Sequence, residues 1–138
     1  MTAPTLTAPI PLIDLGVVHA PIADELRAAF ERVFTSPLVR AIDTCRLAGL
    51  ASLAEVREEL FEWDYGEYEG RTTDDIREER AGWSLWRDGC PGGERVADVG
   101  SRVDTLLTEL RTLSGAVALF AHGHVLRVLA ARWIGLPP

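Results

Sequence analysis

Residues 117–126 read Val-Ala-Leu-Phe-Ala-His-Gly-His-Val-Leu, and this stretch decides how the chain is expected to fold. Its apolar run has the length of a buried β-strand and ends at His122. Gly123 then turns the chain into a segment whose apolar residues recur at helical spacing. This order places an imidazole at the carboxyl end of a strand, beside the free backbone N–H groups of a helix N-terminus. The stretch therefore predicts a phosphate pocket.

Composition limits the classes of protein that fit. The chain has 138 residues, of which 47% are hydrophobic and 25% charged, as in an ordinary soluble domain. Its net charge of −7 disfavours a general nucleic-acid or anionic-membrane surface. All 14 basic residues are arginine, which fits either a compositional bias of the genome or a need for bidentate phosphate contacts. We expect one domain over residues 1–138.

Cysteine usage and the N-terminus indicate the compartment. Cys45 and Cys90 form no CxxC pair and have no metal-ligand spacing to a histidine, which predicts two free thiols in a reducing cytoplasm. The sequence has neither a signal-peptide pattern nor an apolar run near the ~18 residues that a membrane span needs. His122 and His124 lack a third ligand at a recognisable spacing. We therefore expect a cytoplasmic protein with no metal and no cofactor.

Hydrophobic periodicity along the chain predicts helices that alternate with short buried strands. Pro4, Pro9 and Pro11 deny the first residues a regular ladder or helix, so residues 1–10 are expected to form a loose arm. The alternation argues for an α/β layer fold with a largely parallel sheet. The expected order is a helix over 21–32, a strand over 33–35, a helix over 36–47, a weak strand over 55–60, a loop over 61–70, a helix over 72–80, a loop over 83–93, a helix from 94 or 96 to 113, a strand over 117–121 and a final helix.

Two early segments carry side chains suited to an anion site. Arg40 lies about one turn into a helix that leaves a strand, so its guanidinium can point back over the end of that strand. An exposed helix arginine is the alternative. The segment 60–70 places carboxylates, among them Glu62, beside apolar rings, which raise the pKa of a carboxyl group and suit a general acid. A solvated acidic loop is the alternative.

Later segments add three further features. His122 is either a phosphate ligand or a buried structural histidine. Gly92-Gly93-Glu94 opens a helix, for which capping is the expected role. Three tryptophans either line the substrate site or pack in the core: Trp63, Trp83 and Trp86.

Taken together, these segments resemble the histidine phosphatase superfamily in its phosphoglycerate-mutase-like branch. Ser36-Pro37-Leu38 with Arg40-Ala41 is similar to the family's second arginine motif, and residues 60–70 are similar to its acid loop. Residues 91–94 resemble its Gly-Glu helix start, and Ala121-His122-Gly123 its second-histidine motif. The resemblance runs from about residue 11 to residue 138 in the family's order. It implies a three-layer α/β/α fold with a mostly parallel sheet.

The resemblance also implies a two-step phosphoryl transfer through a phosphohistidine, on a small phosphorylated metabolite. By position, Arg40 corresponds to the second arginine and His122 to the second histidine, and both would bind phosphoryl oxygens. Gly123 would let the backbone approach the phosphate. Glu62 corresponds to the acid that protonates the leaving oxygen and then acts as base for water.

One element of the family pattern does not occur in this sequence. No Arg-His-Gly, the motif that carries the family's nucleophile, is present, and the first and last strands of the family's sheet have no counterpart. His19 aligns with the start of the first helix, and His124 with a position that lines the pocket or caps a helix, so neither corresponds to the nucleophile. We expect a strand near 117–121 to lack one backbone partner. The interpretation is an incomplete domain, from a truncated gene product or a gene model begun at an internal Met1.

Three functions follow as hypotheses. The first is a protein that descends from phosphoric monoester hydrolases but whose hydrolysis is severely impaired, because this chain lacks the nucleophile. The second is a non-catalytic phosphate-binding or interaction protein. The third is a phosphoglycerate-mutase-type enzyme, disfavoured because the short spacing from Gly70 to Pro91 leaves little room for the insertions of a mutase. The sequence does not fix the oligomeric state, the phosphate ester, or whether the chain folds stably alone.

Overall fold

The computed structural model describes residues 28–138. Three parallel strands form its sheet in the order β2-β1-β3, with bounds β1 (Arg32–Thr35), β2 (Ala54–Val56) and β3 (Val117–Phe120). β1 lies in the middle, where Phe34 is opposite Glu55 on one side and Leu119 on the other. The predicted parallel sheet is confirmed. The expected arm over 1–10, most of the expected helix over 21–32, and His19 lie outside the described residues.

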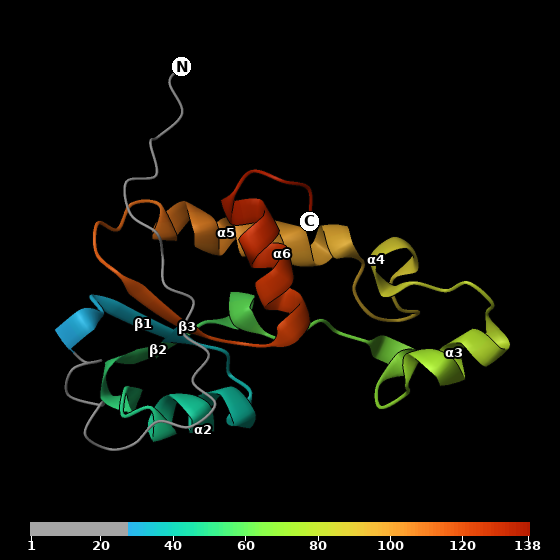
Figure 1. Ribbon diagram of the computed structural model, residues 1–138, viewed down its shortest axis with the longest axis horizontal. Coiled ribbons are helices and arrows are strands. Elements are labelled where there is room, and N and C mark those ends of the chain that lie inside the picture. The colour runs from blue at the N-terminus through green and yellow to red at the C-terminus, as the bar shows by residue number, and fades with distance from the viewer. Residues whose placement is uncertain (1–27) are drawn as a thin grey trace.

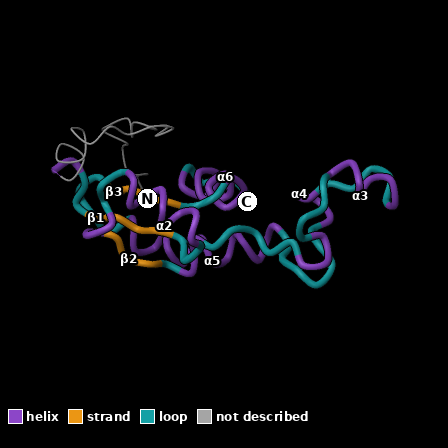
Figure 2. The backbone as a smooth tube through the Cα atoms, turned by 90° about the horizontal axis from the view of Figure 1, so that it is seen from below, coloured by secondary structure: helices purple, strands orange, loops and turns teal. Residues whose placement is uncertain are grey.

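Helices cover both faces of this sheet, as Figure 1 shows. α2 lies on one face, and α5 and α6 lie together on the other, so the expected three-layer arrangement is present. Figure 2 shows that α3 and α4 extend to one end, away from the strands. The helical elements are α2 (Val39–Leu47), η1 (Ala51–Leu53), η2 (Glu58–Leu60), η3 (Gly66–Tyr68), α3 (Thr73–Glu79), α4 (Leu85–Asp88), α5 (Val96–Leu110) and α6 (Gly123–Trp133).

Alternation along β1 divides the interior into two cores, because successive side chains of a strand point to opposite faces. Val33 packs with the residues of α2, whereas the neighbouring Phe34 packs with those of α5 and α6. Both side chains are fully buried. The core beneath α5 and α6 is the larger and reaches Ile76 in α3 and Leu85 in α4. The site-bearing loops are therefore anchored to the same core as the sheet.

Several predicted boundaries differ from the structure. The helix expected over 21–32 does not continue past residue 29, and the helix expected over 36–47 begins at Val39. The strand expected over 55–60 is the shorter β2, after which the chain forms η2. The long helix ends at Leu110 rather than Leu113, and Leu113 packs against the same core from the turn that follows. The apolar residues that predicted the helix therefore continue beyond its last turn. The expected loop over 83–93 contains the short helix α4, whose first turn is closed by the Asp88 carboxylate accepting the backbone N–H of Ser84 at 2.8 Å.

β3 is an outer strand of the described sheet. Within residues 28–138 it pairs only with β1, and Val117, Ala118 and Leu119 are half-buried. The expected strand with one missing backbone partner is therefore present in this part of the chain. No helix of the described residues is long and apolar enough to cross a membrane.

The α5 stripe should dominate the stability of the fold. Leu107 is fully buried, and Leu107→Ala should lower the free energy of unfolding by about 2–5 kcal/mol through lost burial and a residual cavity. Leu47 in α2 is 74% exposed, so Leu47→Ala should change it by less than about 0.5 kcal/mol. Urea titration followed by circular dichroism measures both. Equal effects of the two substitutions would contradict this account of the core.

Candidate active site

His122 lies at the junction between β3 and α6 and is only 7% exposed. Its Nδ1 accepts a hydrogen bond from Arg40 Nε at 3.0 Å, and its Nε2 lies 2.8 Å from Ser36 Oγ. A guanidinium can only donate, so Nδ1 must be unprotonated and Nε2–H donates to the Ser36 hydroxyl. Both ring nitrogens are thus engaged, by residues that follow the neighbouring strand β1.

The surroundings of His122 keep its ring neutral. Burial lowers the pKa of His122, the Arg40 guanidinium lowers it further, and the Glu62 carboxylate opposes them. A neutral ring is also what the hydrogen bond from Arg40 requires. The structure therefore brings Arg40 and His122 together, as the sequence predicted, but in direct contact with each other.

The Glu62 carboxylate occupies the N-terminus of α6. Its Oε1 accepts the backbone N–H groups of Trp63 at 3.0 Å and Val125 at 3.1 Å, and its Oε2 accepts that of His124 at 3.4 Å. The expectation that these N–H groups are free for a phosphate is wrong. The helix N-terminus is an anion site, as predicted, but the chain's own carboxylate fills it.

Arg40 and Glu62 line one cavity of about 580 Å³. Its other walls come from the N-cap of α2, the acid loop, the residue before the N-cap of α5, and α5 itself, namely Leu38, Phe61, Trp63, Asp64, Tyr65, Gly66, Glu69, Glu94 and Arg102. Gly123 lies beside His122 with nothing within 4 Å of the position that a Cβ would take. Packing within the described chain thus gives no reason for a glycine at this position.

An ion pair between Glu94 and Arg102 fixes the loop that carries Glu62. Arg102 Nε and Nη2 donate to the two Glu94 oxygens at 2.7 and 3.0 Å. The same guanidinium donates to the carbonyls of Glu59 at 2.7 Å and Glu62 at 3.3 Å, and Glu94 accepts the Asp64 N–H at 2.9 Å. The predicted capping role of Glu94 is wrong, because its carboxylate is drawn to Arg102 and the acid loop instead.

Two glycines allow the acid loop to lie directly on the 91–93 turn. Gly66 has φ of +51°, and a Cβ there would lie 2.3 Å from the Pro91 carbonyl oxygen. A Cβ on Gly93 would lie 2.3 Å from the Asp64 carbonyl oxygen. Backbone contacts this close exclude any side chain, so the position of Glu62 depends on both glycines.

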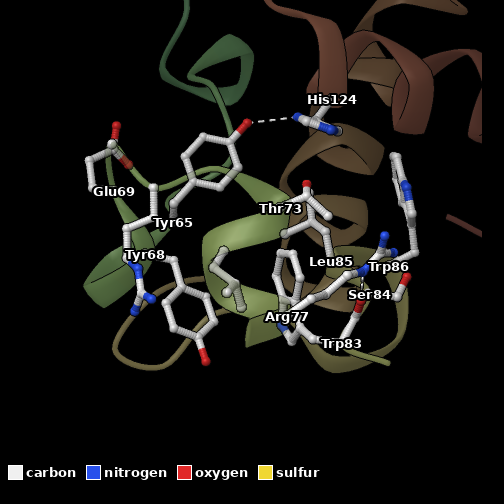
Figure 3. Close-up of a pocket in the computed structure, with 13 residues that line it drawn as sticks. Tyr65, Tyr68, Glu69, Thr73, Arg77, Trp83, Ser84, Leu85, Trp86 and His124 are labelled. Atoms are coloured by element: carbon white, nitrogen blue, oxygen red, sulfur yellow. Dashed lines mark hydrogen bonds between the residues drawn. The ribbon is translucent and has the colours of Figure 1, made fainter. Parts of the chain in front are cut away.

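A second cavity, of about 390 Å³, opens beside the first (Figure 3). Aromatic rings form much of its wall, and the hydroxyl of Tyr65 lies 2.7 Å from His124 Nδ1. Burial, reinforced by the charges of Glu62 and Glu69, raises the pKa of Tyr65 to about 12, so the phenol stays protonated. Trp83 and Trp86 both line this cavity, whereas Trp63 is buried in the core and lines the first one.

Sequence reasoning missed three side chains that organise the site. Ser36 was noted as a helix start, yet its hydroxyl bonds His122. Tyr65 lines both cavities, and Arg102 fixes the acid loop from the middle of α5. Position directly after a strand was a usable signal for Ser36. Nothing in the local pattern distinguished Arg102 from the other charged residues of its helix.

Within residues 28–138, no group of three or more histidine, cysteine, aspartate or glutamate side chains is placed to hold a metal ion.

A family model described as the histidine phosphatase superfamily, branch 1, matches residues 7–138. The chain belongs to this superfamily. An acid phosphatase of Mycobacterium tuberculosis is 42% identical over 134 residues, which cover 93% of this chain and 66% of that protein. A 2,3-bisphosphoglycerate-dependent phosphoglycerate mutase of Rhizobium meliloti is 38% identical, over 86% of this chain and 65% of the mutase.

Solved structures of this superfamily share the fold. A protein from a Mycobacterium tuberculosis open reading frame superimposes with a TM-score of 0.74 at 42% identity, over 84% of this chain and 63% of that one. A mycobacterial glucosyl-3-phosphoglycerate phosphatase in complex with inorganic phosphate gives a TM-score of 0.69 at 31% identity, over 83% of this chain and 64% of that one. The chain spans about two thirds of the length of these histidine phosphatase relatives.

The neutral state of His122 should make stability depend on pH. Because its pKa is lowered on folding, the unfolded chain takes up a proton that the folded chain resists. The stabilisation is fully present above the ordinary histidine pKa of about 6.5 and is lost as the pH falls through the lower, folded value. Urea titrations between pH 7.5 and pH 5 should show a smaller loss in His122→Gln than in the wild type. The same pH dependence in both proteins would contradict the assignment.

Removal of the Arg102 guanidinium should loosen the acid loop. Arg102→Ala leaves the Glu94 carboxylate and two carbonyls without their donor, at a cost of about 1–3 kcal/mol in the free energy of unfolding. Arg46→Ala in α2 is the matched control, because Arg46 is 68% exposed and, among residues 28–138, its side chain pairs only with Asp43. Thermal melts of the two variants measure the difference. If Arg102→Ala lowers the melting temperature no more than Arg46→Ala does, the Arg102 guanidinium does not hold the acid loop.

Proposed function

We propose that this chain carries the phosphate-binding and proton-donating part of a phosphoric monoester hydrolase site, which acts on a small soluble phosphate ester through a phosphohistidine. The observation that carries the proposal is the 3.0 Å contact between Arg40 Nε and His122 Nδ1, beside the Glu62 carboxylate. These three side chains come from α2, from the acid loop and from the start of α6. Membership of the histidine phosphatase superfamily supports the same chemistry.

In this site Arg40 and His122 bind the phosphoryl oxygens. A guanidinium fork matches the negative charge spread over a transferring phosphoryl group, and the imidazole adds a further hydrogen bond. Arg40 Nε now donates to His122 Nδ1, so an anion that enters between them takes over the Arg40 donor, and His122 donates to it only after Nδ1 gains a proton. The backbone at Gly123, next to His122, is open: nothing lies within 4 Å of the position that a Cβ would take.

Glu62 protonates the leaving oxygen and then accepts a proton from the attacking water. A general acid must lie within hydrogen-bonding reach of the oxygen that it protonates. Glu62 lines the same cavity as Arg40, and its carboxylate is held by the N–H groups of His124 and Val125, next to His122 in sequence. Its fixed position beside the phosphate ligands supports this role.

The covalent step needs a nucleophile that this sequence does not supply. In the histidine phosphatase superfamily the nucleophile is the histidine of an Arg-His-Gly motif. That motif does not occur among the 138 residues of this chain. His122 is no substitute, because both of its ring nitrogens are engaged as hydrogen-bonding partners. We therefore propose that this chain by itself binds phosphate but turns over its esters very slowly.

A non-catalytic phosphate-binding protein is the second candidate. The engaged ring of His122 and the absent Arg-His-Gly favour it, since a pocket with ligands but no nucleophile can recognise phosphate without reaction. A mutase is the less favoured member of the superfamily, because only a short segment separates Gly70 from Pro91. The buried free thiols of Cys45 and Cys90 support a reducing cytoplasm as the compartment.

Calorimetry with inorganic phosphate and vanadate tests the binding half of the proposal. The wild-type chain should bind both, and Arg40→Ala and His122→Ala should each weaken binding at least about tenfold, the loss expected for a charge-assisted contact. Arg46→Ala on the same helix, with its side chain 68% exposed, should bind like the wild type. Equal binding by all four proteins, or none by the wild type, would refute the pocket.

An aryl phosphate assay tests the catalytic half. Hydrolysis by the wild-type chain should be barely above the uncatalysed rate. Robust turnover that His122→Ala abolishes would mean that a nucleophile is present after all and that the hydrolase is complete. Binding without turnover favours the non-catalytic candidate for this chain.

A further inference from the structure

The second cavity is walled by aromatic side chains from three stretches of the chain, residues 65–68, residues 83–86 and the start of α6. Tyr65 and Trp86 lie on opposite sides of it, His124 lies at one end and Trp83 at the other (Figure 3). These rings also contact one another edge to face: Trp86 and His124 have centroids 5.5 Å apart, and Tyr65 and His124 are 5.9 Å apart. Trp86 is 40% exposed although it is one of the largest apolar side chains, so part of an aromatic face is open to solvent.

This aromatic cavity adjoins the cavity that Arg40 and Glu62 line. Tyr65 and Glu69 line both cavities. His124 links them as well: its backbone N–H donates to Glu62 Oε2 at 3.4 Å, while its ring lies in the aromatic cavity. A ligand whose one end meets Glu62 therefore has the aromatic cavity directly beside that end.

The geometry of proton transfer decides which end of a substrate faces these rings. If Glu62 protonates the leaving oxygen, that oxygen lies within hydrogen-bonding distance of its carboxylate. The group attached to the oxygen must then extend away from Arg40 and His122, which hold the phosphoryl oxygens. The His124 and Tyr65 side of Glu62 is the side on which the aromatic cavity opens.

We propose that the aromatic cavity is the leaving-group subsite of this phosphate site, and that it takes the ring of a phosphate monoester of an aromatic alcohol. The assignment rests on the proposed function. The rings of Tyr65, Trp86 and His124 can accept a further aromatic ring in the edge-to-face geometry that they already form with one another. The volume of about 390 Å³ is ample for a one- or two-ring group.

The polar groups of the cavity favour an aromatic ring over a polyol. Arg71 is bound by both oxygens of Glu79, and Arg77 Nε donates to the Trp83 carbonyl at 3.0 Å. The Tyr65 hydroxyl is bonded to His124. These contacts already use part of the hydrogen-bonding capacity that a sugar would need, whereas Trp86 is 40% exposed and offers ring surface to a ligand.

Calorimetry on the full 138-residue chain tests the subsite with three probes: 1-naphthyl phosphate, glycerol 3-phosphate and 1-naphthol. The two esters share the phosphate and differ in the ring, so naphthyl phosphate should bind about tenfold more tightly. Trp86→Ala should remove most of that ratio, and Trp86→Phe, which keeps a ring, should retain it. His122→Ala should weaken both esters alike and leave the ratio intact.

The outcomes separate the subsite from the phosphate site. A ratio near one, or a ratio that Trp86→Ala leaves unchanged while circular dichroism shows a folded protein, overturns the subsite even if phosphate binds. If 1-naphthol binds in a way that depends on Trp86, but neither ester binds through its phosphate, the ring-binding pocket is supported. That outcome overturns the proposed function. Preference for glycerol 3-phosphate would overturn the aromatic substrate class.

Discussion

The site depends on one electrostatic contact, the Glu62 carboxylate on the N-terminus of α6. Backbone N–H groups at a helix start have no partner within the helix and carry the positive end of its dipole. Glu62 satisfies those of His124 and Val125, and in doing so it ties the acid loop to the residues that directly follow His122. Glu62 and His122 are thereby positioned by the same short stretch of backbone, at the junction of β3 and α6.

This contact is held from behind by the larger core. Arg102 projects from α5 to bind Glu94 and two carbonyls of the acid loop, while the apolar stripe of α5 packs on Phe34 and on α6. α5 therefore positions both partners of the Glu62 contact, the loop through hydrogen bonds and α6 through burial. In this way α5 determines where Glu62 lies.

The two cavities give the site a chemical direction. Arg40 lines the first cavity and is hydrogen-bonded to His122, which lines neither cavity, whereas the rings of Tyr65, Trp86 and His124 line the second. Glu62 lines the first cavity, and its carboxylate accepts the backbone N–H of His124, whose ring lines the second. Tyr65 belongs to both cavities, and its phenol, which stays protonated, hydrogen-bonds His124 without adding negative charge beside Glu62.

Local pattern determined the elements of this protein. The apolar run before His122, the helical spacing after it and the alternation of strands and helices were enough to predict the parallel sheet. The resemblance to histidine phosphatases predicted that Arg40 and His122 belong to one site. These features depend on residues near one another in sequence or on strand ends that must share one side of a sheet. Tertiary structure alone decided which partners the polar groups take. Glu62 reaches α6, Glu94 turns to Arg102 and Ser36 bonds His122, because each pairing joins segments that only the packed cores bring within hydrogen-bonding distance.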